Sequence, residues 1–99
     1  MNKMHKLSYT DEAKSNLAEL KKQGQFKKLK KIKNALDKLK EDPRHPGLHT
    51  HKYKSFNGSN GEDIFQSYIE NRTPGAFRVF WHYGPEKEFI TIVAITPHP

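Results

Sequence analysis

Arg78 and His98 are the two residues of this sequence best suited to chemistry on a phosphate group. Arg78 lies among apolar neighbours, an unusual place for a cation, and His98 directly follows the last predicted strand. Arginine carries a planar, permanent charge that fits phosphate, and histidine gives or takes a proton near neutral pH. The pair fits cleavage of a phosphodiester by an attacking 2′-hydroxyl, which needs a base, an acid and a cation at the phosphorus. This chemistry needs no metal and no cofactor.

A structural role for the same two residues stays open. Arg78 could pair with Glu70 or Glu88 on a flanking strand, and His98 could be a loose penultimate residue. An arginine and a terminal histidine are not specific for catalysis by their spacing alone.

A second group lies in residues 49–54, where basic side chains alternate with an aromatic one. The basic members are His49, His51, Lys52 and Lys54, and Tyr53 lies between the lysines. Such a segment can bind single-stranded RNA through phosphate contacts and base stacking. Two histidines without a nearby carboxylate are too few for a closed metal site. A solvated loop is the alternative interpretation.

A third group consists of lysines on one face of the helix predicted for residues 25–41. The 3.6-residue period places them opposite the apolar stripe of that helix. They would neutralise phosphates without recognising a base sequence, or form an ordinary solvated face, or receive an acidic protein tail. The members are Lys27, Lys30, Lys31 and Lys38.

The composition limits the function classes. The chain has 99 residues, enough for one domain, and a net charge of +7. The whole excess lies in residues 1–45, which hold 13 basic and 6 acidic residues. A one-sided basic surface is typical of a protein that binds phosphate backbones or an acidic partner. There is no cysteine, and no motif of a serine hydrolase, P-loop or dinucleotide site. No membrane span is predicted, so we expect a cytoplasmic protein.

The elements that position these residues can be predicted from periodicity. Residues 7–9 alternate as a short strand, and Thr10 is suited to cap a helix that ends before Gly24. The two helices, within residues 11–41, should form an antiparallel hairpin. Residues 42–63 are predicted as loop, and residues 64–70, 76–83 and 88–96 as an antiparallel meander.

The middle strand of the meander predicts which side chains share a face. Period two places Val79 and Trp81 on the face that packs on the helices, and Arg78 and His82 on the opposite, open face. The predicted fold class is α+β, with a short strand and a helix hairpin packed on a twisted antiparallel sheet of about four strands. The expected core is Leu17, Leu20, Phe26, Leu29, Ile32, Leu36, Phe77, Val79, Trp81 and Val93.

This order of elements resembles the RelE/ParE superfamily of toxins from bacterial type II toxin–antitoxin systems. The most specific part of the resemblance is the segment Phe77-Arg78-Val79-Phe80, followed by Ile92-Val93-Ala94-Ile95-Thr96-Pro97-His98. The apolar positions of both helices and the break at Asp42-Pro43 support it. The resemblance covers nearly the full chain, as one domain over residues 1–99.

The resemblance implies a function for the whole chain. RelE-like members are ribosome-dependent mRNA endonucleases that a cognate antitoxin neutralises, so the implied partners are an acidic antitoxin, mRNA and the ribosome. In RelE-like members an arginine of the meander handles the scissile phosphate, and the resemblance assigns this role to Arg78. Several members keep a basic or histidine residue just after the last strand, and His98 occupies that position here. ParE-like members poison DNA gyrase instead. A gyrase inhibitor and a non-catalytic RNA- or ribosome-binding module are therefore the alternatives.

Two departures from the RelE pattern bear on catalysis. The first meander strand, residues 64–70, carries no lysine, and Lys52 and Lys54 before it are the nearest substitutes. The sequence ends at Pro99, so the tyrosine that some members carry in a C-terminal tail has no counterpart after His98.

Overall fold

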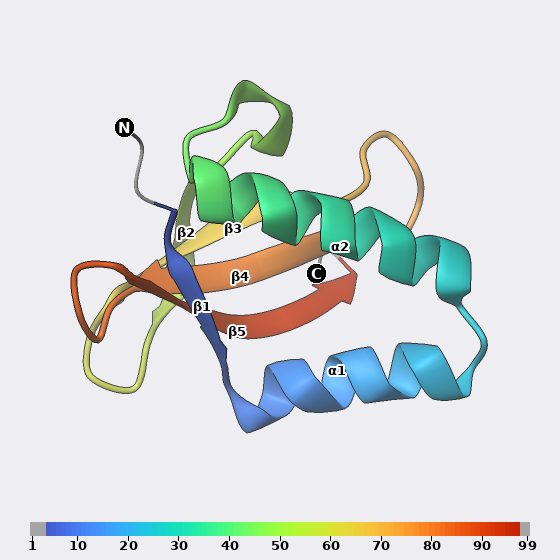
Figure 1. Cartoon of the computed structure of the whole chain (residues 1–99), viewed down its shortest axis with the longest axis horizontal. Helices are drawn as coiled ribbons and strands as arrows, with labels where there is room; N and C mark the ends of the chain where they lie inside the picture. Colours follow the sequence, from blue (N-terminus) through green and yellow to red (C-terminus); the bar gives the residue numbers. More distant parts are fainter. Residues whose placement is uncertain (1–3, 98–99) are drawn as a thin grey trace.

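The computed structural model describes residues 4–97, in which two α-helices cover one face of a five-stranded sheet (Figure 1). The strands are β1 (Lys6–Tyr9), β2 (His51–Asn57), β3 (Asp63–Tyr68), β4 (Phe77–Tyr83) and β5 (Phe89–Pro97). The helices are α1 (Asp11–Lys22), α2 (Phe26–Glu41) and the short 3-10 helix η1 (Pro46–Leu48). The strand order is β1-β5-β4-β3-β2. The predicted α+β class and helix hairpin are confirmed.

Local sequence signals explain the helices. The Thr10 hydroxyl accepts a hydrogen bond from the backbone N–H of Ala13 at 3.1 Å, which caps α1, and it donates to the carbonyl of Val93 at 2.6 Å. The first of these bonds starts the helix, and the second ties its start to β5. Gly24, with φ of 70°, makes the turn between α1 and α2, where a side chain would be strained.

The core lies between the helices and the covered face of the sheet. Both helices contribute apolar side chains at helical spacing, and the sheet contributes Val79 and Trp81 from β4. A smaller apolar cluster lies on the open face, formed around Ile64, Phe80 and Ala94. Alternating residues of β4 thus serve opposite faces, as the sequence predicts.

The sheet differs from the prediction at both edges. β2 occupies part of the segment that was predicted as loop, so the sheet has five strands within residues 4–97 instead of about four. Its side chains are exposed except for the half-buried Tyr53, and therefore show no hydrophobic alternation. At the other edge β1 runs parallel to β5, so the sheet is mixed and not purely antiparallel.

Two predicted core residues lie elsewhere. Phe26 is 65% exposed, because it is the first residue of α2, where the hairpin extends beyond the ends of the strands (Figure 1). Val93 packs against the open-face cluster. The β4–β5 register places Phe80 opposite Ala94 but Trp81 opposite Ile92, so Val93 is the extra residue of a β-bulge. Within the described residues, no helix combines the length and apolar character needed to cross a membrane.

Candidate functional site

Arg78 lies near the start of β4, and its side chain is only 7% exposed. In the sheet it is opposite Tyr68 of β3 and Thr96 of β5. Its guanidinium carbon lies 3.7 Å from the centroid of the Tyr68 ring, a close cation–π contact. The predicted catalytic arginine is therefore a buried cation that is stacked on an aromatic side chain.

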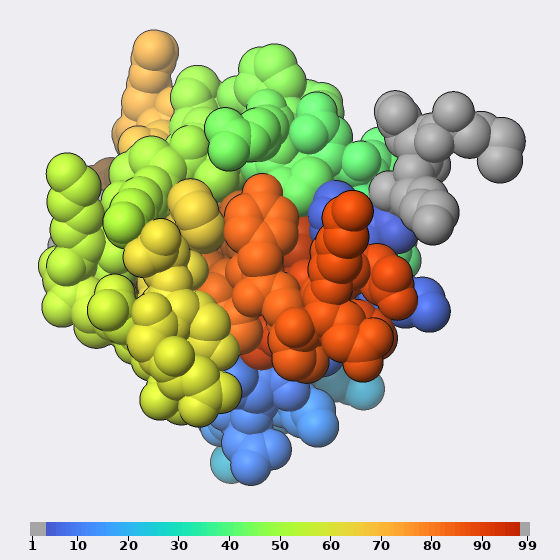
Figure 2. Space-filling model, turned by 90° about the vertical axis from the view of Figure 1, so that its left-hand side faces the viewer, coloured from blue at the N-terminus to red at the C-terminus, as the bar shows by residue number. Residues whose placement is uncertain are grey.

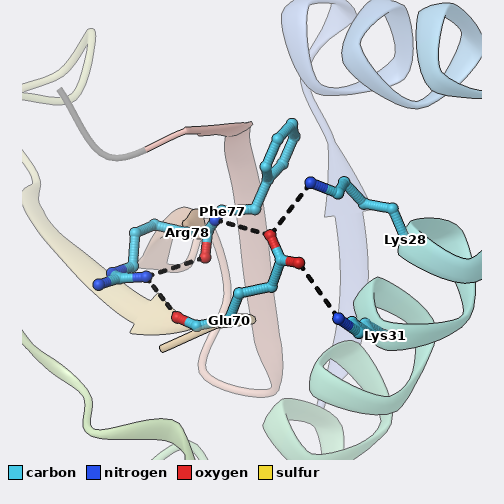
Figure 3. A network of polar contacts seen from close by, with 5 residues as sticks. All are labelled: Lys28, Lys31, Glu70, Phe77 and Arg78. Atoms are coloured by element: carbon cyan, nitrogen blue, oxygen red, sulfur yellow. Dashed lines mark hydrogen bonds and ion pairs between the residues drawn. The ribbon is translucent and has the colours of Figure 1, made fainter. Parts of the chain in front are cut away.

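Backbone carbonyls provide the hydrogen bonds of Arg78 (Figure 3). Its Nη1 donates to the carbonyl oxygen of Glu70 at 2.5 Å and to that of Phe77 at 3.2 Å. Its Nε is buried and finds no partner in the described part of the chain. No carboxylate within residues 4–97 forms an ion pair with Arg78, so in this part of the chain its charge is balanced by carbonyl dipoles and the Tyr68 ring.

The carboxylate of Glu70 turns away from Arg78 toward α2 (Figure 3). It pairs with Lys28 at 3.2 Å and with Lys31 at 3.3 Å, and it accepts a hydrogen bond from the N–H of Phe77 at 3.2 Å. Burial by itself raises the pKa of Glu70, but the hydrogen bonds from Phe77 and the two lysines outweigh it, so the pKa is lowered. The alternative in which Arg78 pairs with the carboxylate of Glu70 or Glu88 is not observed in residues 4–97, since Arg78 meets Glu70 through its backbone carbonyl.

Two histidines approach the same tyrosine. The ring centroid of His49 lies 5.1 Å from that of Tyr68, and the ring of His51 lies edge-on at 5.9 Å. Both histidines are exposed. Tyr68 therefore connects the buried cation to two groups that can exchange protons. We call Arg78, Tyr68, His49 and His51 the Tyr68 cluster.

A hydrogen-bonded chain fixes the loop that carries His49 and leads to His51, the first residue of β2. The Thr50 hydroxyl donates to the carbonyl of Pro43 at 2.8 Å, so its oxygen accepts from the Ser67 hydroxyl at 2.7 Å. The Ser67 oxygen in turn accepts from Nε1 of Trp81 at 2.8 Å. Since Ser67 and Trp81 are fully buried, this chain anchors the loop after α2 to the core.

The predicted lysines are placed as follows. Lys27, Lys30, Lys31 and Lys38 are exposed on α2, as expected, but Lys31 is engaged by Glu70. On β2, Nζ of Lys52 forms an ion pair with Oδ1 of Asp63 at 3.3 Å, and Lys54 is exposed.

Sequence reasoning did not include Tyr68. The register of the predicted meander was the available signal, since it places Tyr68 directly opposite Arg78. His98 lies outside the described residues, so its predicted place beside Arg78 stays a prediction. Within residues 4–97, no three His, Asp or Glu side chains gather closely enough to hold a metal ion.

No protein-family model and no curated protein matches this sequence. Solved structures do match it. A YoeB/ParE toxin from Agrobacterium tumefaciens is 13% identical with a TM-score of 0.71, over 95% of this chain and 99% of that one. The YoeB dimer from Staphylococcus aureus is 16% identical with a TM-score of 0.63, over 98% and 99%. The archaeal RelE–RelB complex from Pyrococcus horikoshii is 16% identical with a TM-score of 0.63, over 95% and 94%. This chain therefore has the fold of the RelE/ParE superfamily toxins.

Proposed function

We propose that this chain is the toxin of a type II toxin–antitoxin pair and that it stops translation by cutting mRNA on the ribosome, without a metal. The observation that carries the proposal is the Tyr68 cluster, in which a buried arginine without an acidic partner in residues 4–97 stacks on Tyr68, and two exposed histidines approach the same ring. Phosphodiester cleavage by a 2′-hydroxyl needs this combination of a cation and groups that exchange protons.

Arg78 is the residue that we assign to the scissile phosphate. Its Nε–H is buried and not used by the described part of the protein, and an unpaired buried donor is costly, so a shift of the covering groups that lets a substrate oxygen reach it would be favoured. In the transition state the guanidinium would stabilise the charge that builds on the phosphate oxygens. His98 remains our predicted proton donor to the leaving 5′-oxygen.

The proposed partners follow from charge and fold. One of the similar structures is a RelE–RelB complex, and this chain has a net charge of +7. An acidic antitoxin would complement that charge. The exposed lysines Lys27, Lys30 and Lys38 on α2, with Lys54 on β2, would hold mRNA or ribosomal RNA through phosphate contacts.

One observation favours a second candidate, a non-catalytic RNA- or ribosome-binding module. Two backbone carbonyls already accept from Nη1 of Arg78. A substrate phosphate would have to use the remaining donors or displace those bonds. If Arg78 only stabilises the sheet, the basic surface would still bind RNA, but no strand would be cut.

The test is expression of the wild type, Arg78→Ala and His98→Ala in a bacterial host, with growth measured and mRNA ends mapped. We expect the wild type to arrest growth and create new ends inside reading frames, and each variant to weaken both effects. Growth arrest with intact mRNA and damaged DNA would indicate gyrase as the target. Equal arrest by all three proteins would exclude these two residues as the catalytic pair.

A further inference from the structure

Three aromatic side chains form a cluster on the open face of the sheet, at its β2 edge. The ring of Tyr53 lies edge-on to the other two, with its centroid 5.0 Å from that of Phe56 and 5.1 Å from that of Phe80. The centroids of Phe56 and Phe80 are 6.4 Å apart. We call these three residues the aromatic cluster. Figure 2 shows that yellow-green β2 and the yellow turn after it form an exposed edge of the molecule.

The side chains of the aromatic cluster become more exposed toward the edge of the sheet. Phe80 on β4 is buried, Tyr53 on β2 is half-buried, and Phe56 is 45% exposed. Phe56 therefore contacts the cluster with part of its ring and leaves the rest to solvent. Because the other two rings already hold it in place, stacking of a ligand on Phe56 costs little ordering entropy.

An irregularity of β2 turns Phe56 to this face. Residues three apart on a regular strand point to opposite faces, so Phe56 and Tyr53 would be separated by the sheet. The pairing register shifts here, because β2 runs from Tyr53 to Asn57 while β3 moves only from Ile64 to Asp63. Such bulges redirect a side chain and are frequent beside functional sites. The exposed ring thus lies on the open face because of a specific backbone feature.

The aromatic cluster is close to Arg78 along β4. Arg78 and Phe80 are two residues apart on this strand and so share the open face, about 6.6 Å from each other along the strand. Successive nucleotides of an extended RNA strand are separated by a comparable distance. With the scissile phosphate at Arg78, the base of a neighbouring nucleotide can therefore reach the aromatic cluster.

The charges at the β2 edge suit RNA. Lys54 is exposed, and no carboxylate within residues 4–97 pairs with it. The two acidic residues around the start of β3 have basic neighbours, since Asp63 pairs with Lys52 and Glu62 lies 3.7 Å from His82. A cation near an exposed aromatic ring is the combination with which proteins bind single-stranded nucleic acid.

We propose that the aromatic cluster binds the base of a nucleotide next to the scissile phosphate, with this base stacked on Phe56 and a phosphate of the same strand held by Lys54. The inference rests on the proposed function and adds a base-binding site to the arginine that holds the phosphate. Every base has a flat aromatic face, so the site accepts all four bases. Its role is to position the RNA strand, not to exchange protons.

Two substitutions of Phe56 and one control isolate the stacking contact. Phe56→Leu keeps an apolar side chain on the cluster but removes the flat ring, whereas Phe56→Trp keeps a ring. Phe26→Leu is the matched control, because Phe26 is also an exposed phenylalanine but is the first residue of α2 and lies outside the cluster.

The experiment measures binding of each purified protein to a single-stranded RNA and to an oligomer of the same length that lacks its bases. We expect Phe56→Leu to weaken binding of the RNA about tenfold, and Phe56→Trp and Phe26→Leu to stay within about threefold of the wild type. Binding of the abasic oligomer should be the same for all four proteins, since it offers nothing to stack. The tenfold loss should persist at higher salt, whereas the lysine contacts weaken.

Equal binding of the RNA by Phe56→Leu and Phe26→Leu, or an equal loss with the abasic oligomer, would overturn the base-binding site. Cleavage of mRNA on ribosomes by the same proteins separates this result from the proposed function. If the wild type cuts mRNA but Phe56→Leu binds RNA as the wild type does, the proposed function stands without the base-binding site. If binding follows our expectation but the wild type cuts no mRNA, the nuclease assignment fails and the base-binding site stands. If the wild type binds no RNA, both fail.

Discussion

The guanidinium of Arg78 rests on the ring of Tyr68, with 3.7 Å from its central carbon to the ring centroid. This contact supplies part of the stabilisation that a carboxylate usually gives to a buried cation. The same ring is also approached by His49 and His51, so the two parts of the candidate site meet at one side chain.

Two substitutions of Tyr68 should distinguish what its ring contributes to stability from what its hydroxyl contributes. Tyr68→Phe keeps the face on which Arg78 stacks, whereas Tyr68→Leu removes it. We expect Tyr68→Leu to lower the free energy of unfolding by about 1–2 kcal/mol more than Tyr68→Phe does, because a largely desolvated cation–π contact is lost. Urea denaturation measures the difference. Equal losses in both variants would mean that the contact contributes nothing to stability.

Ser67 should be needed for the stability of the core. Ser67→Ala leaves Nε1 of Trp81 buried without an acceptor and cuts the link to Thr50. We expect a loss of about 1–3 kcal/mol in the free energy of unfolding. Ser55→Ala, an exposed position on β2, is the control and should change stability by less than about 0.5 kcal/mol. A Ser67→Ala protein as stable as this control would contradict the anchoring role.

Glu70 should make stability depend on pH. Its folded-state pKa is lowered, so its charged form stabilises the protein above the unfolded-state value of about 4.3, and this stabilisation is lost as the pH falls through the folded-state value. At pH 7, Glu70→Gln should be less stable by about 1 kcal/mol, because it loses its pairs with Lys28 and Lys31. The difference should shrink in acid. Thermal unfolding from pH 7 to pH 3 tests this, and a constant difference would exclude the ion pairs as its cause.

The lysine face of α2 should set the affinity for RNA. Reversal of Lys27, Lys30 and Lys31 to Glu should remove most of the binding to RNA or ribosomes and flatten its salt dependence, since phosphate contacts release counterions. Lys27 and Lys30 should account for most of the effect, because Lys31 is engaged by Glu70. The control reverses Lys14, Lys21 and Lys22 on α1, an equal change in net charge. Equal losses in both triple variants would indicate general electrostatics.

Most of the fold could be predicted from the sequence because local signals agreed. The Thr10 cap, the apolar stripe of α2 and the alternation in β4 each point to one structure. β2 could not be predicted, since a strand with exposed side chains lacks a periodic signal. The parallel pairing of β1 with β5 depends on contacts between the two ends of the chain, which no local pattern encodes.

The candidate site was predicted only in part. The alternation of residues in β4 predicted that Arg78 lies on the open face of the sheet, away from the helices. It could not show that Tyr68 covers the guanidinium. His49 and His51 were singled out as a separate group, and their approach to Tyr68 depends on the pairing of the unpredicted strand β2.

The most direct test of the account compares the wild type with Arg78→Lys in single-turnover cleavage of mRNA on purified ribosomes. Lysine keeps the positive charge but lacks the planar fork of donors that arginine brings to a phosphate. We predict cleavage by the wild type and a rate about a hundredfold or more lower for Arg78→Lys, with ribosome binding nearly unchanged. Cleavage by Arg78→Lys at the wild-type rate, or intact mRNA with the wild type, would contradict the account.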